Sequence, residues 1–476
     1  MNLCALRLNY KKTTEEKQMK LIYGVKDKPK FGQTLVFAFQ QLLAILAATI
    51  AVPAIVGNGM SSSAALFGAG VGTLVYLLFT KFRSPVFVGS SFAFIGPMLS
   101  AFAGAASASL GYVGLILGAV FAGLVYVVLA IIVKLAGVNW INKLMPAVVI
   151  GPTVSIIGLS LAGNAVGDLQ KGNVTHMVDG AAVQSASVCL CILCGLVTLA
   201  TVIICSVFGK KMARMIPFII GIVAGYGLAA IFTVIGNLTD TAALQIINFS
   251  AFKNMQWYPD FTFIEALKGV KEINGAYVAS IAVAYVPVAL VVFAEHIADH
   301  KNLSSIIEQD LLENPGLSRT LLGDGVGSMA GAFFGGCPNT TYGESVGCVA
   351  ISGNASVVTI LTTAIMAIVV SFFAPFVTFL STIPSCVMGG VCIALYGFIA
   401  VSGLKMLQPV DLNDNRNLFV ASTILITGIG GLSLTFGKVT ITTVACALIL
   451  GILVNLLTNG KRKDEPCEDV VDEEAK

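Results

Sequence analysis

Residues 34–56 read TLVFAFQQLLAILAATIAVPAIV, and no Asp, Glu, Lys, Arg or His occurs from residue 34 to residue 80. Two further runs, 85–133 and 144–167, lack the same five residue types. A helix needs about 20 consecutive apolar residues to cross the hydrocarbon core of a bilayer. All three runs exceed that length, so the sequence predicts a polytopic, all-helical membrane protein.

The overall composition agrees with this prediction. Of the 476 residues, 56% are hydrophobic and 11% are charged, whereas a soluble domain carries about 25% charged residues. The net charge is only +3, and the Lys and Arg residues do not gather into a nucleic-acid-binding patch, which argues against a nucleic-acid partner. Most of the eleven cysteines lie in apolar stretches, and the Cys189, Cys191, Cys194 group lacks the second half of a zinc motif. We therefore expect no metal and no cofactor. The polar, basic start of the chain predicts no cleavable signal peptide.

The pattern predicts fourteen membrane segments separated by mostly short connections. Two longer polar connections cover residues 164–184 and 237–276. The first seven segments span residues 34–56, 63–80, 86–105, 111–136, 144–163, 185–208 and 214–236. The second seven span residues 277–299, 318–336, 338–352, 354–379, 384–404, 416–433 and 438–458.

Basic residues predict the orientation of these segments. With fourteen spans and both termini in the cytoplasm, 23 of the 28 Lys and Arg residues fall on the cytoplasmic side, as the positive-inside rule requires. The five residues outside this partition are Lys171, Lys253, Lys268, Lys271 and Lys438. Residues 1–32 then form a cytoplasmic arm and residues 459–476 a cytoplasmic tail.

Seven plus seven spans imply that the second half enters the membrane from the opposite face, which is the inverted-repeat plan of many transporters. Segment three opens as SPVFVGSSFAFIGP (84–97), and segment ten as FGGCPNTTYGE (334–344). Both mix Pro, Gly and hydroxyl residues at membrane depth, where non-helical backbone survives only against protein or a watery cavity. We expect these extended starts to pair and the helices after them to offer free N–H groups to a substrate. The alternative is that glycine and proline are simply frequent in membrane helices.

Carboxylates at membrane depth are confined to segments eight to ten. Glu295 and Asp299 are four residues apart and share one helix face. Glu344 follows in segment ten, and such costly intramembrane acids indicate function. Desolvation and a like-charged neighbour favour the neutral acid, which suits a carboxyl group that binds and releases a proton. Asp299 could instead be solvated at the cytoplasmic end of its helix. We expect Asp324, flanked by glycines, to brace helix packing.

Two histidines of segment eight, His296 and His300, also lie four residues apart but face away from Glu295. The His-Glu-x-x-His order of zinc hydrolases is absent. The sequence therefore does not predict an intramembrane metalloenzyme, and it contains no nucleophile–base arrangement for another enzyme.

Four motifs carry a resemblance to a known family. They are GSSFAF (89–94), AEH (294–296), PNTTYGE (338–344) and SGLKML (402–407). With them the chain resembles the nucleobase–cation symporter-2 family, also called nucleobase–ascorbate transporters, and within it the bacterial uracil permease branch. The similarity extends over roughly residues 31–458.

The resemblance implies a core domain of spans 1–4 and 8–11 (33–136 and 277–379) and a gate domain of spans 5–7 and 12–14 (137–236 and 380–458), with residues 237–276 as an extracellular loop. It implies proton-coupled import of uracil through the cytoplasmic membrane by movement of core against gate, and a homodimer formed through gate surfaces. By similarity, Glu295 and Glu344 bind the base, Phe92 and Gly343 add backbone contacts, Tyr342 lines the pocket, and Glu295, Asp299 and Glu344 couple transport to protons.

Some positions depart from the pattern of the resembled family. Uracil permeases commonly have His where this chain has Asp299, and the purine branch commonly has Asp there. Gln41 stands where the family usually has His, and Ser345 where its signature has Asn. A xanthine or other purine symporter on the same scaffold is therefore the nearest alternative. An anion exchanger of the same architecture is a further one, although two glutamates in the site disfavour an anion.

Overall fold

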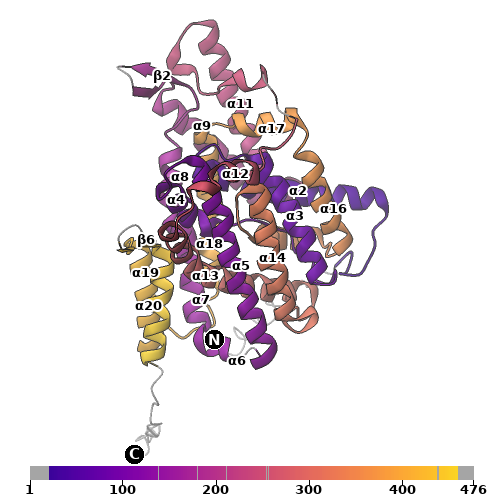
Figure 1. The fold of residues 1–476 in the computed structure, drawn as a ribbon. Helices are drawn as coiled ribbons and strands as arrows, with labels where there is room; N and C mark the ends of the chain where they lie inside the picture. The colour runs from indigo at the N-terminus through magenta and orange to yellow at the C-terminus, as the bar shows by residue number, and fades with distance from the viewer. Residues whose placement is uncertain are drawn as a thin grey trace, which may run out of the picture.

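The computed structural model describes residues 21–458 except 138, 179–180, 211, 254, 256 and 437–438. Most of the predicted N-terminal arm and the tail 459–476 lie outside the described residues. The described chain is predominantly helical (Figure 1). Eight helices within it are long and apolar enough to cross a membrane, or nine if one bent pair counts as a single span. The chain is therefore a multi-pass membrane protein.

Each of the fourteen predicted segments coincides with at least one helix. The helices of the first half are α2 (Phe31–Val56), α3 (Ser62–Phe79), α4 (Ile95–Ala103), α5 (Ala108–Ala136), α6 (Asn139–Leu144), α7 (Ala147–Ser160), α8 (Ala162–Asp168), α9 (Val188–Phe208), α10 (Met212–Met215) and α11 (Pro217–Leu238). Those of the second half are α12 (Thr262–Gly269), α13 (Gly275–Ile307), α14 (Leu317–Gly335), α15 (Gly343–Ser352), α16 (Val357–Val370), α17 (Ala374–Thr382), α18 (Ser385–Lys405), α19 (Asn415–Ile429) and α20 (Thr443–Thr458).

The two interrupted segments pair with each other as expected. Strand β1 (Val88–Ser90) runs antiparallel to β4 (Asn339–Thr341), with Gly89 opposite Thr340. Gly336 adopts a left-handed conformation (φ 75°) that ends α14 and turns the chain into β4. A short 3-10 turn (Phe92–Phe94) and α4 follow β1, and α15 follows β4. The ladder thus joins the two halves of the chain.

Several boundaries differ from the sequence prediction. Residues 354–379 form two helices, α16 and α17, that meet at 84°, because Pro375 in the first turn of α17 cannot continue a preceding helix. The last segment begins at Thr443 rather than at residue 438, since β5 (Leu434–Phe436) and β6 (Val439–Ile441) form a hairpin before it. Segment eight does not end at residue 299, because α13 continues for two further turns to Ile307.

The long polar connections also contain regular structure that hydropathy does not reveal. The first connection includes the end of α8 and a hairpin of β2 (Thr175–Val178) and β3 (Ala181–Gln184). The second contains 3-10 turns and α12, which packs on α5. In Figure 1 the β2 hairpin lies at one end of the molecule and α6 at the other.

Close helix packing depends on glycine at the crossing of α14 with α3 and α5. A Cβ atom at Gly327 would lie 2.7 Å from the carbonyl oxygen of Gly72, and one at Gly325 would lie 2.7 Å from Cβ of Tyr126. Small residues of this kind let the backbones of membrane helices approach each other closely. The glycines that flank Asp324 are therefore packing residues.

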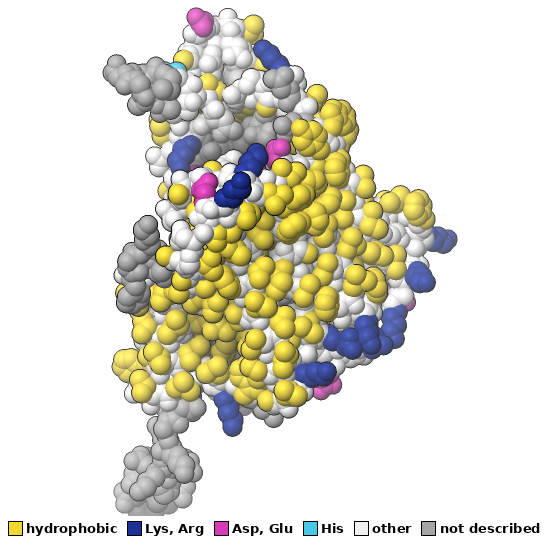
Figure 2. Space-filling view, in the orientation of Figure 1, with side chains coloured by type: hydrophobic (Ala, Val, Ile, Leu, Met, Phe, Trp, Pro, Cys, Tyr) yellow, Lys and Arg dark blue, Asp and Glu magenta, His cyan; other side chains and the backbone are white. Residues whose placement is uncertain are grey.

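Side chains on the outer surface separate by polarity. Figure 2 shows a broad apolar field over the middle of one face, with Lys and Arg side chains along its lower edge. A smaller group of basic and acidic side chains lies above that field (Figure 2). This distribution is what a belt in contact with lipid, bounded by two polar surfaces, requires.

Candidate functional site

A cavity of about 350 Å³ lies between two groups of helices. One wall is made by α13, by the 3-10 turn after β1 and by the start of α15; the opposite wall is made by α7, α9, α11 and α18. The cavity is lined by all five predicted substrate-binding residues and by Asp299, the predicted proton-coupling residue that is not among those five. These residues are Phe92, Glu295, Asp299, Tyr342, Gly343 and Glu344.

Three carboxylates face this cavity. Glu295 and Asp299 come from consecutive turns of α13, and Glu344 comes from the first turn of α15. Thr341 Oγ1 donates a 2.8 Å hydrogen bond to Asp299 Oδ2. Glu295 makes no hydrogen bond or ion pair within the described part of the chain. Asp299 is therefore held in place by the protein, whereas Glu295 has its hydrogen-bonding capacity available.

Backbone geometry supplies donors beside these acids. Gly343 begins α15 immediately after β4, and Phe92 begins the 3-10 turn that leads into α4. The first N–H groups of a helix have no partner within the helix and favour electron-rich ligands. The pairing of β1 with β4 brings these two helix starts to the same cavity.

Tyr342 is fixed by contacts on several sides. Its hydroxyl donates a 3.0 Å hydrogen bond to the carbonyl oxygen of Ser90 and lies 3.3 Å from Thr49 Oγ1. Its ring lies over Gly89, where a Cβ atom would be 2.6 Å from the ring. The side chain that lines the site is thus positioned by α2 and by β1.

Around the cavity lie further residues that sequence reasoning did not select. Phe92 packs edge-on against Tyr396 of α18, with ring centroids 5.5 Å apart. Ser206 near the end of α9 and Arg214 of α10 line the cavity, and Asn302 lines it from α13, one turn beyond Asp299. The sequence did hold a signal for Arg214, namely the basic residues Lys210, Lys211 and Arg214 before α11. These residues served above only to predict orientation.

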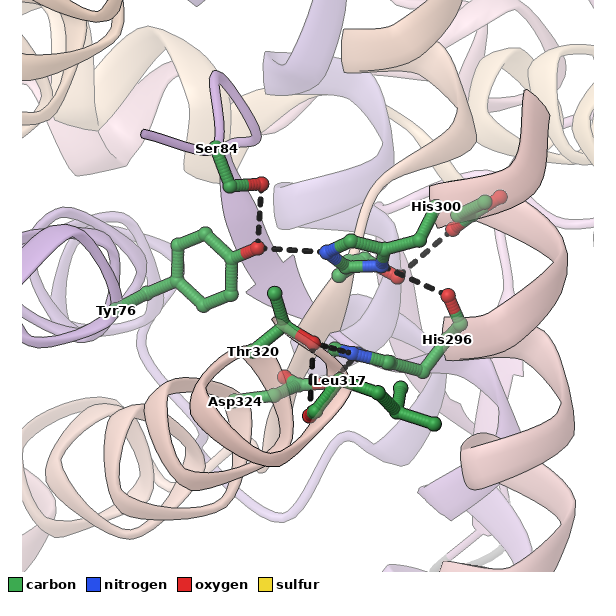
Figure 3. A network of polar contacts seen from close by, with 9 residues as sticks. Tyr76, Ser84, His296, His300, Leu317, Thr320 and Asp324 are labelled. Atoms are coloured by element: carbon green, nitrogen blue, oxygen red, sulfur yellow. Dashed lines mark hydrogen bonds and ion pairs between the residues drawn. The ribbon is translucent and has the colours of Figure 1, made fainter. Parts of the chain in front are cut away.

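His296 and His300 lie on the other face of α13, away from the cavity. His296 Nδ1 is 2.7 Å from Asp324 Oδ2, and His300 Nε2 is 2.7 Å from the hydroxyl of Tyr76. Figure 3 shows this buried network between α13, α14 and α3. Asp324 therefore belongs to the packing of α14 rather than to the acid-lined cavity, as its flanking glycines indicated.

Two of the departures from the family pattern contact each other. Gln41 Nε2 donates hydrogen bonds to Ser345 Oγ and, at 3.3 Å, to the carbonyl oxygen of Ser345. The amide of Phe87 also donates to Ser345 Oγ, at 3.2 Å. The two unusual residues thus form one interaction between α2 and α15, at the residue that follows Glu344 in the chain.

A second cavity, of about 400 Å³, lies beside the connection between α2 and α3. Its lining includes serines at the start of α3, Tyr258, Asp260 and residues of α17. Burial and the neighbouring Glu265 raise the pKa of Asp260. This cavity has one carboxylate where the first has three, so the first is the candidate site.

Apolar spans around an internal cavity lined by acids are typical of a membrane transporter. Residues 32–436 match a family described as "Permease family", so the chain belongs to this family. It is a membrane permease and not an enzyme.

The relatives cover nearly the whole chain. The "Uracil permease" of Bacillus caldolyticus is 40% identical over 449 residues, which are 93% of this chain and 96% of that protein. Uracil permeases of Bacillus subtilis (strain 168) and Escherichia coli (strain K12) are 36% and 33% identical, over 94% and 95% of this chain and 97% of each relative. The predicted family resemblance is confirmed.

Solved structures show the same fold. The transmembrane domain of the cyanobacterial bicarbonate transporter BicA superimposes with a TM-score of 0.56 at 17% identity and covers 91% of this chain and 98% of that one. The murine Slc26a9 anion transporter gives a TM-score of 0.61 at 11% identity over 91% of this chain and 69% of that one. At such low identity these matches concern the fold alone.

Proposed function

We propose that this permease imports uracil across the cytoplasmic membrane together with protons. The observation that carries the proposal is the meeting of Glu295, Glu344 and the start of α15 at Gly343 in one cavity. The two glutamates come from segments eight and ten of the chain, and both are partly exposed to the cavity.

The chemistry of the cavity fits the edges of a nucleobase. Uracil is flat and presents alternating N–H and C=O groups. A carboxylate accepts the N–H groups in charge-assisted hydrogen bonds, and free N–H groups at Phe92 and Gly343 can donate to the C=O groups. In our proposal Glu295 and Glu344 bind the N–H edge, and Tyr342 closes one side of the base. The names of the uracil permeases that resemble this chain support uracil as the substrate.

Proton coupling is assigned to the same acids. Three carboxylates in one cavity cannot all be charged without strong mutual repulsion, so some of them hold protons. We propose that Glu295, Asp299 and Glu344 take up a proton when the site faces outward and release it when the site faces inward. Asp299, bonded to Thr341, replaces the histidine that is common at this position in uracil permeases, and it keeps a titratable group there.

The transport movement is assigned to two groups of helices. Helix α14 packs on α3 and α5, and α16 packs on α2 and α3, whereas α18 packs on α7 and α9, and α19 packs on α20. This grouping supports the core domain (33–136 and 277–379) and the gate domain (137–236 and 380–458). We propose fourteen spans in two inverted repeats with both termini in the cytoplasm; the basic edge in Figure 2 supports a single cytoplasmic surface.

Ligand-induced thermal stabilisation tests the substrate assignment. A ligand that binds only the native state raises its melting temperature, so uracil and xanthine are compared on purified protein in detergent. We expect uracil but not xanthine to stabilise the wild type, and Glu344→Gln to lose this stabilisation. Glu308→Gln, at the exposed end of α13 and outside the cavity, is the matched control and should respond like the wild type.

Two other outcomes of the thermal assay would change the assignment of substrate or site. Stabilisation by xanthine would reassign the substrate to purines, and a uracil response that survives Glu344→Gln would remove Glu344 from the site. Uptake of labelled uracil into proteoliposomes, with and without an inward proton gradient, tests coupling. Equal uptake under both conditions would contradict it.

A further inference from the structure

A second group of buried polar side chains lies behind α13 and has no part in the proposed transport chemistry. His296 has no exposed surface, and Asp324 is 1% exposed. In Figure 3 their side chains point toward each other between α13 and α14, and Thr320 lies next to them. Such groups are costly to bury unless their hydrogen bonds are complete.

The available protons determine how His296 and Asp324 are paired. Thr320 Oγ1 donates its one proton to the carbonyl oxygen of Leu317 at 3.0 Å, so it accepts from His296 Nε2, also at 3.0 Å. A second proton lies between His296 Nδ1 and Asp324 Oδ2, which are 2.7 Å apart. Whichever of these two atoms holds it, the pair carries no net charge. Asp324 Oδ2 is therefore satisfied.

The other oxygen of this carboxyl group, Asp324 Oδ1, has no hydrogen-bond partner among the described residues. The same holds within the described chain for the hydroxyl groups of Tyr126 and Ser328. Tyr126 is 3% exposed and Ser328 is 5% exposed. All three residues line one cavity between α5 and α14, with a volume of about 10 Å³.

We propose that this cavity binds one water molecule, held by Asp324 Oδ1, Tyr126 and Ser328. The volume is about what one water requires, and buried waters typically make about three hydrogen bonds. A water donates to the carboxyl oxygen and to one hydroxyl oxygen and accepts from the other hydroxyl. A hard cation needs about six oxygen ligands, more than a cavity of about 10 Å³ accommodates, and the neutral Asp324–His296 pair offers it no excess negative charge.

The bound water gives α5, α14 and α13 a common connection. Tyr126 belongs to α5, Asp324 and Ser328 belong to α14, and Asp324 continues the connection to His296 on α13. His296 is the neighbour of Glu295 in the chain, on the opposite face of the helix. The water site therefore supports, from behind, the helix that presents Glu295 to the substrate cavity.

A structure of the purified protein at a resolution that shows ordered waters tests the site directly. We expect a peak about 2.6–3.0 Å from the three oxygens. No peak would overturn the proposal. A peak at about 2.4 Å from the oxygens would indicate a hard cation instead of water. A melting temperature that is higher in sodium chloride than in choline chloride would identify that cation as sodium, and either result would overturn the proposal.

Substitutions provide a second test that does not depend on resolution. Tyr126→Phe and Ser328→Ala each remove one partner of the water, so each should lower the melting temperature, and the double variant should lose less than the sum of the two. Ser318→Ala is the matched control, because Ser318 Oγ also lies on α14 but donates directly to the carbonyl oxygen of Ala130 at 2.8 Å. Its effect should add to that of Tyr126→Phe. Additive effects for Tyr126→Phe and Ser328→Ala would refute a shared water.

Discussion

Replacing Gly89 by alanine tests how closely the β1–β4 ladder positions the substrate site. The new Cβ would lie 2.6 Å from the ring of Tyr342, whereas carbon atoms in contact prefer about 3.5–4.0 Å. The ring must therefore move by about 1 Å. Overpacking of this kind costs about 1–3 kcal/mol. Loss of the hydrogen bond from Tyr342 to Ser90 would add about 0.5–1.5 kcal/mol.

The expected result is a protein that folds but is less stable and binds its base more weakly. At about 2 °C per kcal/mol for a large chain, the melting temperature should fall by about 3–9 °C. Uracil affinity, measured by titration calorimetry, should fall at least about tenfold, which corresponds to 1.4 kcal/mol. Gly397→Ala is the control, because a Cβ at Gly397 has no neighbour within 4 Å. If Gly89→Ala matches this control in both measurements, the tight packing of Tyr342 on β1 is not a requirement of the site.

Substitutions can also test the Asp324–His296 pair, the Gln41–Ser345 contact and the raised pKa of Asp260. Asp324→Asn keeps a donor for His296 and should leave the melting temperature near that of the wild type. Asp324→Leu removes this partner and should destabilise the protein by about 1–3 kcal/mol. An equal loss of stability in both variants would contradict the neutral pair. Gln41→Ala and Ser345→Ala should be non-additive in a double-mutant cycle of uracil binding, with a coupling of about 0.5–3 kcal/mol, and additivity would exclude direct contact. Burial raises the pKa of Asp260 above its ordinary 3.8, so the folded protein binds this proton more tightly than the unfolded chain does. Stability is therefore lost as pH rises from about 3.8 through the raised pKa. In Asp260→Asn, the plot of melting temperature against pH should be flatter over this interval, and an unchanged slope would contradict this.

Much of the fold could be predicted because the bilayer imposes strong requirements on the sequence. Long uncharged runs located the spans, and the two interrupted segments pointed to the β1–β4 ladder, since irregular backbone at membrane depth must be covered. The acids could be found for the same reason: Glu295 and Glu344 are costly in lipid and are explained by the cavity that they share.

What could not be predicted depends on contacts between segments far apart in the chain. From the sequence alone, Asp299 could be either a solvated helix end or a functional acid, because hydropathy falls after residue 300, yet α13 continues to Ile307. Thr341 belongs to the PNTTYGE motif (338–344), but only the structure shows that its hydroxyl donates to Asp299. The hairpin before α20 is short and apolar, so it could not be distinguished from the start of a helix.

The β1–β4 ladder also determines when during synthesis the site can first exist. Val88 pairs with Thr341, so roughly 250 residues must be made between the two strands, which takes about 12–50 s at typical translation rates. Until then the first half inserts into the membrane with the polar edge of β1 unpaired, and unpaired backbone groups are costly in lipid. During this time the unpaired edge of β1 must be covered by neighbouring helices or by the insertion machinery. We therefore expect a first half that is expressed alone to be degraded unless the second half is supplied in the same cell.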